Sequence, residues 1–281
     1  MSRKTGTLYV VATPIGNLED ITLRALRILR EVDLIAAEDT RQTTKLLQHY
    51  GIRKFLLSYH EHNERRRTEE LLAQLRAGRS VALVSDAGTP GISDPGYQLI
   101  RACVEEGIPV VPVPGPSAVL AALAASGLAT DRFLFAGFVP RKSSERHRFF
   151  EELKEERGTL ILFESPERIL ESLRDLQAVM GDRRVAVCRE LTKVHEEVFR
   201  GRISDAIAHL GAHPPRGEIT LVVEGASPRS PEDEKTDEDL RRLLAQGESV
   251  RDAAEVVARA YGISRREAYR RALRIRGEGR A

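Results

Sequence analysis

The sequence has few cysteines for its length of 281 residues. Its two cysteines, Cys103 and Cys188, lie far apart and form no Cys-x-x-Cys pair. This pattern excludes a disulfide framework and a cysteine-ligated zinc site, and it is typical of proteins from a reducing compartment. We therefore expect a cytoplasmic protein that holds no metal.

Long apolar runs are also missing. The longest, residues 119–129, is interrupted by Ser126 and Gly127, whereas a membrane-spanning helix needs about 20 apolar residues. The apolar run at residues 8–12 is too short for the core of a signal peptide. The sequence therefore predicts no membrane segment.

Several familiar catalytic motifs are absent. The sequence contains no P-loop, no HExxH motif, no GxSxG motif and no closely spaced set of metal ligands. The only G-x-G, at Gly277 and Gly279, lies near the end of the chain, so no Rossmann fingerprint follows the first predicted strand. These absences argue against P-loop nucleotide enzymes, Rossmann dehydrogenases and the most common methyltransferase fold.

The net charge is small but unevenly distributed. The whole chain carries +2, while the residues from Arg259 onward include eight Arg and two Glu, a local charge of +6. The preceding 258 residues therefore carry −4. A basic tail on an acidic body indicates contact with a polyanion at one end, and the alternative is a solvated helix.

Strand and helix patterns alternate over the first 115 residues. Short β-branched runs predict strands at residues 7–13, 34–38, 55–59, 81–86 and 110–113, and amphipathic patterns predict helices at 21–32, 40–50, 63–77 and 95–106. Strands that alternate with helices indicate right-handed crossovers and a mainly parallel sheet. We expect an N-terminal α/β lobe over residues 6–114.

The next segment reads as a second α/β lobe, residues 115–225, with a mixed sheet. Strands are predicted at 133–139, 159–163, 184–190, 197–201 and 218–224, and helices at 118–125, 145–156, 167–179 and 204–210. The strands at 197–201 and 218–224 are expected to pair as neighbours because their connection is short. The fold class is therefore α/β with two lobes.

A small helical unit follows a predicted linker. Residues 226–236 are rich in Pro, Ser and acidic residues, which is typical of a linker. In the unit at 237–281, helices at 250–260 and 264–275 meet at a turn where Gly262 suits a helix C-cap and Ser264 an N-cap. The pair resembles a helix–turn–helix. Its expected basic residues are Arg265, Arg266, Arg270, Arg271 and Arg274, and its expected apolar face is Val256, Val257, Ile263, Ala268, Ala272 and Leu273.

Three loops rich in glycine and proline follow predicted strands. They are ATPIGN at 12–17, SDAGTPGISDPG at 85–96 and PVPGPSA at 112–118. Such loops are stiff and allow a ligand to approach the backbone closely. Because ligands of open α/β sheets bind beyond the carboxyl ends of the strands, we expect a small-molecule site at this edge. The alternative is that the loops only connect elements.

Together with AEDTR, SYHEHNE, FESPERI, RELTK and GEITLVVEG, these strings carry a specific resemblance. Residues 6–225 resemble the bacterial small-subunit ribosomal RNA (cytidine-2′-O)-methyltransferases of the tetrapyrrole methylase family, and the C-terminal helices are similar to the tail of that group. The resemblance implies a two-lobed tetrapyrrole-methylase fold and a homodimer. It also implies S-adenosylmethionine as cofactor and a cytidine ribose in small-subunit ribosomal RNA, within the ribosomal subunit, as substrate.

The resemblance also implies which residues contact the cofactor. By position these are Pro14, Gly88, Thr89, Ile92, Ser117, Ala118, Phe163, Glu190 and Ile219. Relatives that methylate tetrapyrroles carry Gly-Asp-Pro where this sequence has Gly88, Thr89 and Pro90. The change from Asp to Thr places carboxylate-specific contacts in doubt, whereas backbone contacts can persist.

A ribose hydroxyl is a poor nucleophile, so a base or a cation is expected near it. The catalytic candidates are Glu38, Arg189, Glu190 and Lys193, and the candidates for RNA contact are Arg41, His60, His62, Arg141, Lys142, Arg265, Arg266 and Arg270. These candidates have structural alternatives. Glu38 can cap a helix, and His60 and His62 can be ordinary surface or hydrogen-bonded residues. Glu190 and Lys193 can form an ion pair, and the segment that begins at Arg141 can be the solvated start of a helix.

Two other functions fit parts of the sequence. A methylase of the same fold that acts on a tetrapyrrole or a protein side chain should carry Gly-Asp-Pro and lack a basic tail, so Thr89 and the tail argue against it. A DNA-binding regulator would use the helix–turn–helix, but that pair lacks an evident set of Asn or Gln residues for base readout.

Overall fold

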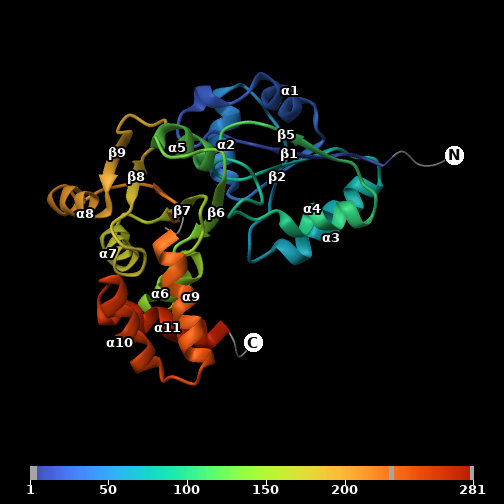
Figure 1. Cartoon of the computed structure of the whole chain (residues 1–281). Coiled ribbons are helices and arrows are strands. Elements are labelled where there is room, and N and C mark those ends of the chain that lie inside the picture. The colour runs from blue at the N-terminus through green and yellow to red at the C-terminus, as the bar shows by residue number, and fades with distance from the viewer. Residues whose placement is uncertain (1–4, 228–230, 279–281) are drawn as a thin grey trace. The chain divides into compact units, whose positions relative to one another are not determined.

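The computed structural model describes residues 5–227 and 231–278, apart from the side chains of Pro231, Glu234, Arg274 and Glu278. The predicted basic side chain of Arg274 therefore lies outside what is described. The chain divides into two compact units, residues 1–226 and 227–281 (Figure 1). Each unit is described by itself.

The first sheet is parallel throughout, as the alternation of strands and helices predicted. Its strands are β1 (Leu8–Val11), β2 (Leu34–Ala37), β3 (Leu56–Ser58), β4 (Val81–Val84) and β5 (Val110–Val113), in the order β3-β2-β4-β1-β5. Helices α1 (Leu23–Glu31), α2 (Thr40–His49), α3 (Glu64–Arg76) and α4 (Tyr97–Glu105) connect them, with a short 3-10 turn at Leu18–Asp20. Figure 1 shows α3 and α4 side by side.

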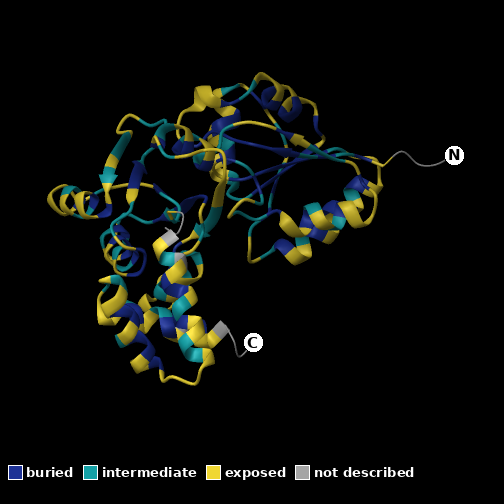
Figure 2. Ribbon diagram, viewed as in Figure 1, coloured by how far each residue is buried: buried dark blue, intermediate teal, exposed yellow. Residues whose placement is uncertain are grey.

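Apolar clusters cover both faces of this sheet. One joins the strands to α1 and α2, and the other joins them to α3 and α4. Figure 2 colours residues by burial; β2 and β4 are buried throughout, whereas the edge strands β3 and β5 are only partly buried. Because both faces are covered, the strands are continuous apolar runs such as LIAA in β2 and VALV in β4, as expected for a buried parallel sheet. Only the edges of the sheet remain for a ligand.

The second sheet is mixed, as expected, but one predicted pairing is wrong. Its strands are β6 (Phe133–Phe138), β7 (Thr159–Glu164), β8 (Arg184–Arg189), β9 (Glu197–Arg202) and β10 (Ile219–Val223), in the order β6-β7-β10-β8-β9. Only β6 and β7 pair in parallel. The strands β9 and β10, which we expected to be neighbours, are separated by β8. The chain forms a hairpin from β8 to β9, and β10 then inserts between β7 and β8, where both of its edges are paired.

Helix α5 (Ala118–Ser126) connects the two sheets. Four residues separate it from the end of β5, and its buried face packs on the second sheet through Val119, Ala122 and Leu123. The opposite face of the second sheet is covered by α6 (Ser143–Leu153), α7 (Ile169–Met180) and α8 (Ile203–Ala212). The N-terminus of α5 is thus held where the first sheet passes into the second.

In its described residues, 231–278, the second unit forms three helices: α9 (Pro231–Ala245), α10 (Val250–Tyr261) and α11 (Arg265–Glu278). The predicted turn is confirmed, because Gly262 has a left-handed φ of 66° and the Ser264 hydroxyl accepts the N–H of Glu267 at 3.2 Å. Helix α9 begins inside the segment that we predicted to be a linker. Proline at its first position and the acidic residues after it suit a helix N-terminus.

The predicted apolar face of this unit is partly wrong. Val257, Ala268 and Ala272 are buried as expected, but Val256 and Leu273 are 55% and 49% exposed. The prediction left out α9, whose Leu240 belongs to the same apolar cluster as residues of α10 and α11. Because α10 also contacts α9, it buries a different face, which is formed by Val250, Ala253, Ala254, Val257 and Ala258.

In the part of the chain that the structure describes, none of the helices combines the length and the apolar character that a membrane span requires.

One buried carboxylate joins α3 to the loop after β4. Glu64 is 9% exposed, and its Oε1 accepts the hydroxyl of Tyr59 and the N–H of Gly96, both at 3.0 Å. Gly96 has φ 144°, and a Cβ there would lie 3.1 Å from the backbone nitrogen of Gly91. The loop therefore closes on itself at Gly96, and Glu64 fixes that end.

We expect Glu64→Ala to destabilise the protein by about 1–3 kcal/mol, because the Gly96 N–H and the Tyr59 hydroxyl would remain buried without their acceptor. Urea unfolding measures this difference. Glu69→Ala, at an exposed position of the same helix, should change the unfolding free energy by less than about 0.5 kcal/mol. Equal effects of the two substitutions would contradict the assigned role of Glu64.

Candidate active site

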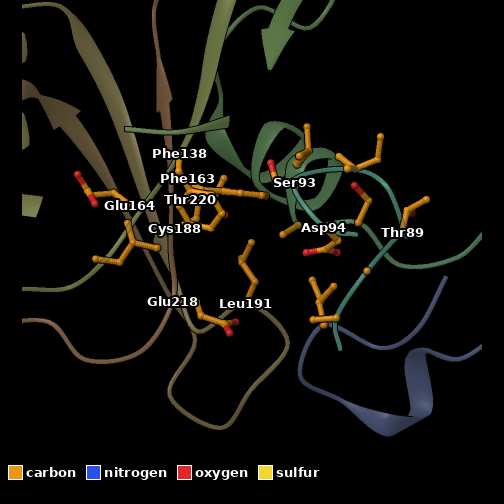
Figure 3. A pocket seen from close by; sticks show the side chains of 18 residues that line it. Thr89, Ser93, Asp94, Phe138, Phe163, Glu164, Cys188, Leu191, Glu218 and Thr220 are labelled. Carbon is orange, nitrogen blue, oxygen red and sulfur yellow. The ribbon is translucent and has the colours of Figure 1, made fainter. Parts of the chain in front are cut away.

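A cavity of about 190 Å³ lies between the carboxyl edge of the first sheet and the second sheet. On one side it is lined by the loop after β4 and by Ile15, and on the other by the ends of β6 and β7 and by β8 and β10. Figure 3 shows Thr89, Ser93 and Asp94 on one side and Phe138, Phe163 and Cys188 on the other. A single buried water needs about 10–15 Å³ of such space, so the cavity can take a ligand of many atoms.

The loop at residues 85–96 is held in place by the loop after β1. Thr13 and Gly88 exchange both backbone hydrogen bonds, at 2.8 and 3.1 Å, and the Thr13 hydroxyl donates to the carbonyl of Ser85 at 3.0 Å. Ser93 has a positive φ of 62°, which is uncommon for a residue with a side chain and often marks a functional site. The predicted meeting of the glycine–proline loops at one edge is confirmed.

The opposite wall is aromatic and apolar. The ring of Phe163 contacts those of Phe135 and Phe138, with centroids 4.8 and 5.3 Å apart. Cys188 is buried, and burial raises the pKa of its thiol to about 11. The thiol is therefore neutral near pH 7 and contributes apolar surface to this wall.

Carboxylates gather where β2 and β4 end. The Glu38 carboxylate accepts the N–H of Asp86 at 3.2 Å, and the Asp86 carboxylate accepts the N–H of Asp39 at 3.0 Å. Burial raises the pKa of both Glu38 and Asp86. Burial also raises the pKa of Asp94 to about 7, with a further contribution from Glu38. The site thus holds carboxyl groups that keep a proton more readily than usual.

The RELTK segment forms a strained loop beside the cavity. Glu190 and Thr192 have positive φ values of 50° and 68°. The Glu190 carboxylate accepts Lys193 Nζ at 2.8 Å and the N–H of Glu218 at 3.2 Å, and the bond from Lys193 lowers the pKa of Glu190. Gly217 has φ +80°, and a Cβ there would lie 2.0 Å from a Glu190 oxygen. These contacts hold the loop so that Leu191 lines the cavity.

The predicted cofactor residues divide into two groups. Seven of them line the cavity: Gly88, Thr89, Ile92, Ser117, Ala118, Phe163 and Ile219. Pro14 and Glu190 do not, although their neighbours Ile15 and Leu191 do. A residue next to a cavity in sequence can point its side chain elsewhere, as Glu190 does toward Lys193 and Gly217.

None of the four predicted catalytic residues lines the cavity. Glu38 is not part of the cavity wall, and its carboxylate accepts the N–H of Asp86. Arg189 is bound to Glu197 through Nε at 2.5 Å, and Glu197 also contacts His209 at 2.8 Å, so Arg189 belongs to an ion-pair network at the hairpin of β8 and β9. Glu190 and Lys193 form the ion pair that the sequence left open as their structural alternative.

The predicted RNA contacts are mostly exposed and partly paired. Arg41 is 87% exposed and pairs with Asp39 at 2.6 Å, and that contact lowers the pKa of Asp39 to about 2. His62 is exposed, whereas His60 is half-buried and contacts Asn63 at 2.9 Å. Arg141 and Lys142 are exposed before α6. On α11, Arg265 pairs with Glu255 and Arg270 with Glu267, and Arg266 is exposed.

Sequence reasoning missed several residues of the cavity. They are Ile15, Ala87, Ser93, Asp94, Val119, Phe138, Glu164, Cys188, Leu191, Glu218 and Thr220. Ser93 and Asp94 lie inside the loop at residues 85–96. The glycine and proline pattern marked that loop as a site but did not show which of its side chains face the ligand.

Among the described residues, no group of three or more His, Cys, Asp or Glu side chains is arranged to hold a metal ion.

Comparison with known proteins agrees with this architecture. Residues 7–207 match the family described as Tetrapyrrole (Corrin/Porphyrin) Methylases, and residues 230–276 match the RsmI C-terminal HTH domain. The chain is also similar in fold to uroporphyrin-III C-methyl transferase from Thermus thermophilus, solved in complex with S-adenyl homocysteine. The TM-score is 0.55 at 21% identity, over 78% of this chain and 97% of that one. The expected two-lobed α/β fold with a C-terminal helical unit is confirmed.

Curated relatives extend over nearly the whole chain. The protein named Ribosomal RNA small subunit methyltransferase I from Synechocystis sp. is 50% identical over 278 residues, which covers 98% of this chain and 100% of that protein. The protein of the same name from Halalkalibacterium halodurans is 47% identical, over 94% of this chain and 93% of its own length. The chain therefore belongs to the tetrapyrrole methylase family, and within it to the group of the ribosomal RNA small subunit methyltransferase I proteins.

Proposed function

We propose that this protein is an S-adenosylmethionine-dependent methyltransferase that methylates the ribose 2′-hydroxyl of a cytidine in small-subunit ribosomal RNA. The observation that carries the proposal is the cavity between the two sheets, in a chain that is 50% identical along its length to a ribosomal RNA small subunit methyltransferase I. The same fold holds S-adenyl homocysteine, the demethylated form of the donor, in a solved relative.

The residues of the cavity fit such a donor. Gly88 and Thr89 form part of the cavity wall, where their peptide groups can contact a ligand. The apolar side chains of Ile92, Phe163 and Ile219 can cover a nucleoside. The carboxyl group of Glu218 also lines the cavity and suits the positive charge of a sulfonium.

When bound, the donor supplies a methyl group on a positively charged sulfur, and the protein has to position the two reactants. The stiff loop at 85–96, fixed by Thr13 at one point and by Glu64 at its end, suits this task. A target nucleotide must leave its stack to reach a cavity between the two sheets. Exposed cations such as Arg41, Arg141 and Lys142 can hold neighbouring phosphates.

We also propose a homodimer that acts on the ribosomal subunit in the cytoplasm. Supporting the dimer, the edge strand β6 leaves Phe133 and Leu134 42% and 38% exposed. An unpaired edge strand with apolar side chains favours contact with another chain.

Calorimetric titration with S-adenosylmethionine should show binding with a dissociation constant on the order of micromolar. Phe163→Ala should weaken that binding by roughly tenfold or more, because the ring covers apolar surface of the cavity. Phe55→Ala, at a 68% exposed phenylalanine outside the cavity, serves as the matched control and should bind like the wild type. Absence of binding by the wild type would contradict the proposed cofactor.

The substrate is tested with small subunits, and separately with deproteinised ribosomal RNA, from a strain that lacks the gene. Incubation with the purified protein and labelled donor should yield 2′-O-methylcytidine at a single nucleotide, identified by nuclease digestion and mass spectrometry. The subunit is expected to be the better of the two substrates. Methylation of a base, or no incorporation into either substrate, would contradict the proposed function.

The basic face of α11 should contribute to RNA affinity through phosphates. The variant with Arg265, Arg266 and Arg270 all changed to Gln should bind RNA more weakly, with a salt dependence reduced by about 0.7–0.9 in log–log slope for each phosphate contact that is lost. A control with Arg24, Arg27 and Arg30 of α1 changed to Gln removes the same charge from exposed positions. Equal slopes in the two variants would assign α11 a packing role instead.

A further inference from the structure

Only a few side chains can accept a proton inside the cavity. Among the described residues, the ionisable groups that line it are Asp94, Glu164, Cys188 and Glu218. Transfer of a methyl group to a hydroxyl leaves a proton that must be removed, and a positioned base near neutral pKa performs this step best. The question is which of these four groups is free to do so.

Glu164 is fully used as a structural anchor. Its side chain has no exposed surface, and its Oε1 accepts the N–H of Ser165 at 2.7 Å and pairs with Arg168. Its other oxygen accepts the hydroxyl of Ser172. The carboxylate therefore ties the end of β7 to α7, and both of its oxygens are occupied by these contacts.

Cys188 and Glu218 are unsuitable for different reasons. The raised pKa of Cys188 keeps its thiol protonated, with Sγ 3.9 Å from the carbonyl of Ala122. The Glu218 side chain is 77% exposed and pairs with Lys193 at 3.3 Å. The Glu218 carboxylate is therefore held in an ion pair with Lys193 at the rim of the cavity.

Asp94 differs from all three. It lines the cavity from the stiff loop, directly after the strained Ser93, and the hydroxyl of Ser85 hydrogen-bonds to it. Three carboxylates from different elements act on it: Glu38 at the end of β2, Asp86 after β4 and Glu218 before β10. Burial and these like charges raise its pKa to about 7, which is near the value that suits a base at physiological pH.

We propose that Asp94 is the residue that takes the proton from the ribose hydroxyl, an inference that rests on the proposed function. The 2′-oxygen forms a bond to the methyl carbon while the carbon–sulfur bond breaks, and the electron pair of that bond stays on sulfur. The hydroxyl proton passes to the Asp94 carboxylate and then to water. Glu38, a catalytic candidate from the sequence, acts through Asp94 by keeping it basic.

The rate depends on pH through the ionisation of the Asp94 carboxyl group. Because the pKa of Asp94 is raised from 3.8 to about 7, the carboxylate is the major form only above about pH 7. The rate of methyl transfer should therefore fall about tenfold for each pH unit below that value and level off above it.

The test compares Asp94→Asn with Asp131→Asn, an exposed aspartate outside the cavity. Single-turnover methylation by Asp94→Asn should be about 10²–10⁴-fold slower and lose its rise with pH, while calorimetry shows that the donor still binds. Asp131→Asn should match the wild type. Carbon-13 NMR of aspartate carboxyls in the wild-type protein without donor should show one that titrates near pH 7, and this signal should be missing in Asp94→Asn.

An Asp94→Asn variant that keeps the wild-type rate and pH profile would overturn the inference. The NMR titration of the wild type decides independently of how the variant folds, because the absence of an aspartate that titrates near pH 7 would overturn the inference as well. These outcomes differ from failure of the proposed function, in which the wild type itself neither binds the donor nor methylates RNA.

Discussion

The pair of backbone hydrogen bonds between Thr13 and Gly88 is the contact on which the rest of the site depends. It joins the loops that leave β1 and β4, two neighbouring strands of the parallel sheet, and so fixes the glycine–proline loop at the carboxyl edge. Glu64 fixes the far end of the same loop at Gly96. A segment anchored in this way can present peptide groups and the Asp94 carboxyl to a ligand without paying a large entropy cost on binding.

The second sheet completes the site and separates structural from chemical roles. Helix α5 passes from the first sheet to the second, so the aromatic wall around Phe163 faces the loop across the cavity. The ion pairs of Arg189 with Glu197 and of Glu190 with Lys193 lie outside this cavity and stabilise the hairpin and the strained loop. The charged groups near the site thus have two roles. In the second lobe they form ion pairs that stabilise the structure, whereas the Asp94 carboxyl group can take up a proton near neutral pH.

The sequence predicted the parallel sheet and the edge where the cavity lies, because β-branched runs alternating with helices leave little freedom in topology and because glycine and proline mark stiff loops. It did not predict the position of β10, since the pairing of distant strands is not encoded in local periodicity. It read the start of α9 as a linker, because Pro and acidic residues suit both a linker and a helix N-terminus. Glu38 was a catalytic candidate from the sequence and Asp94 was not, since only the folded loop shows which carboxyl group reaches the cavity.

In the proposed site the methyl donor binds between the loop at residues 85–96 and the aromatic wall. A crystal structure of the protein with S-adenosylhomocysteine would locate the donor. Density is expected in the cavity, in contact with the backbone of Thr89 and with the side chains of Asp94 and Phe163. Density at any other place, with this cavity filled only by water, would contradict the proposed site.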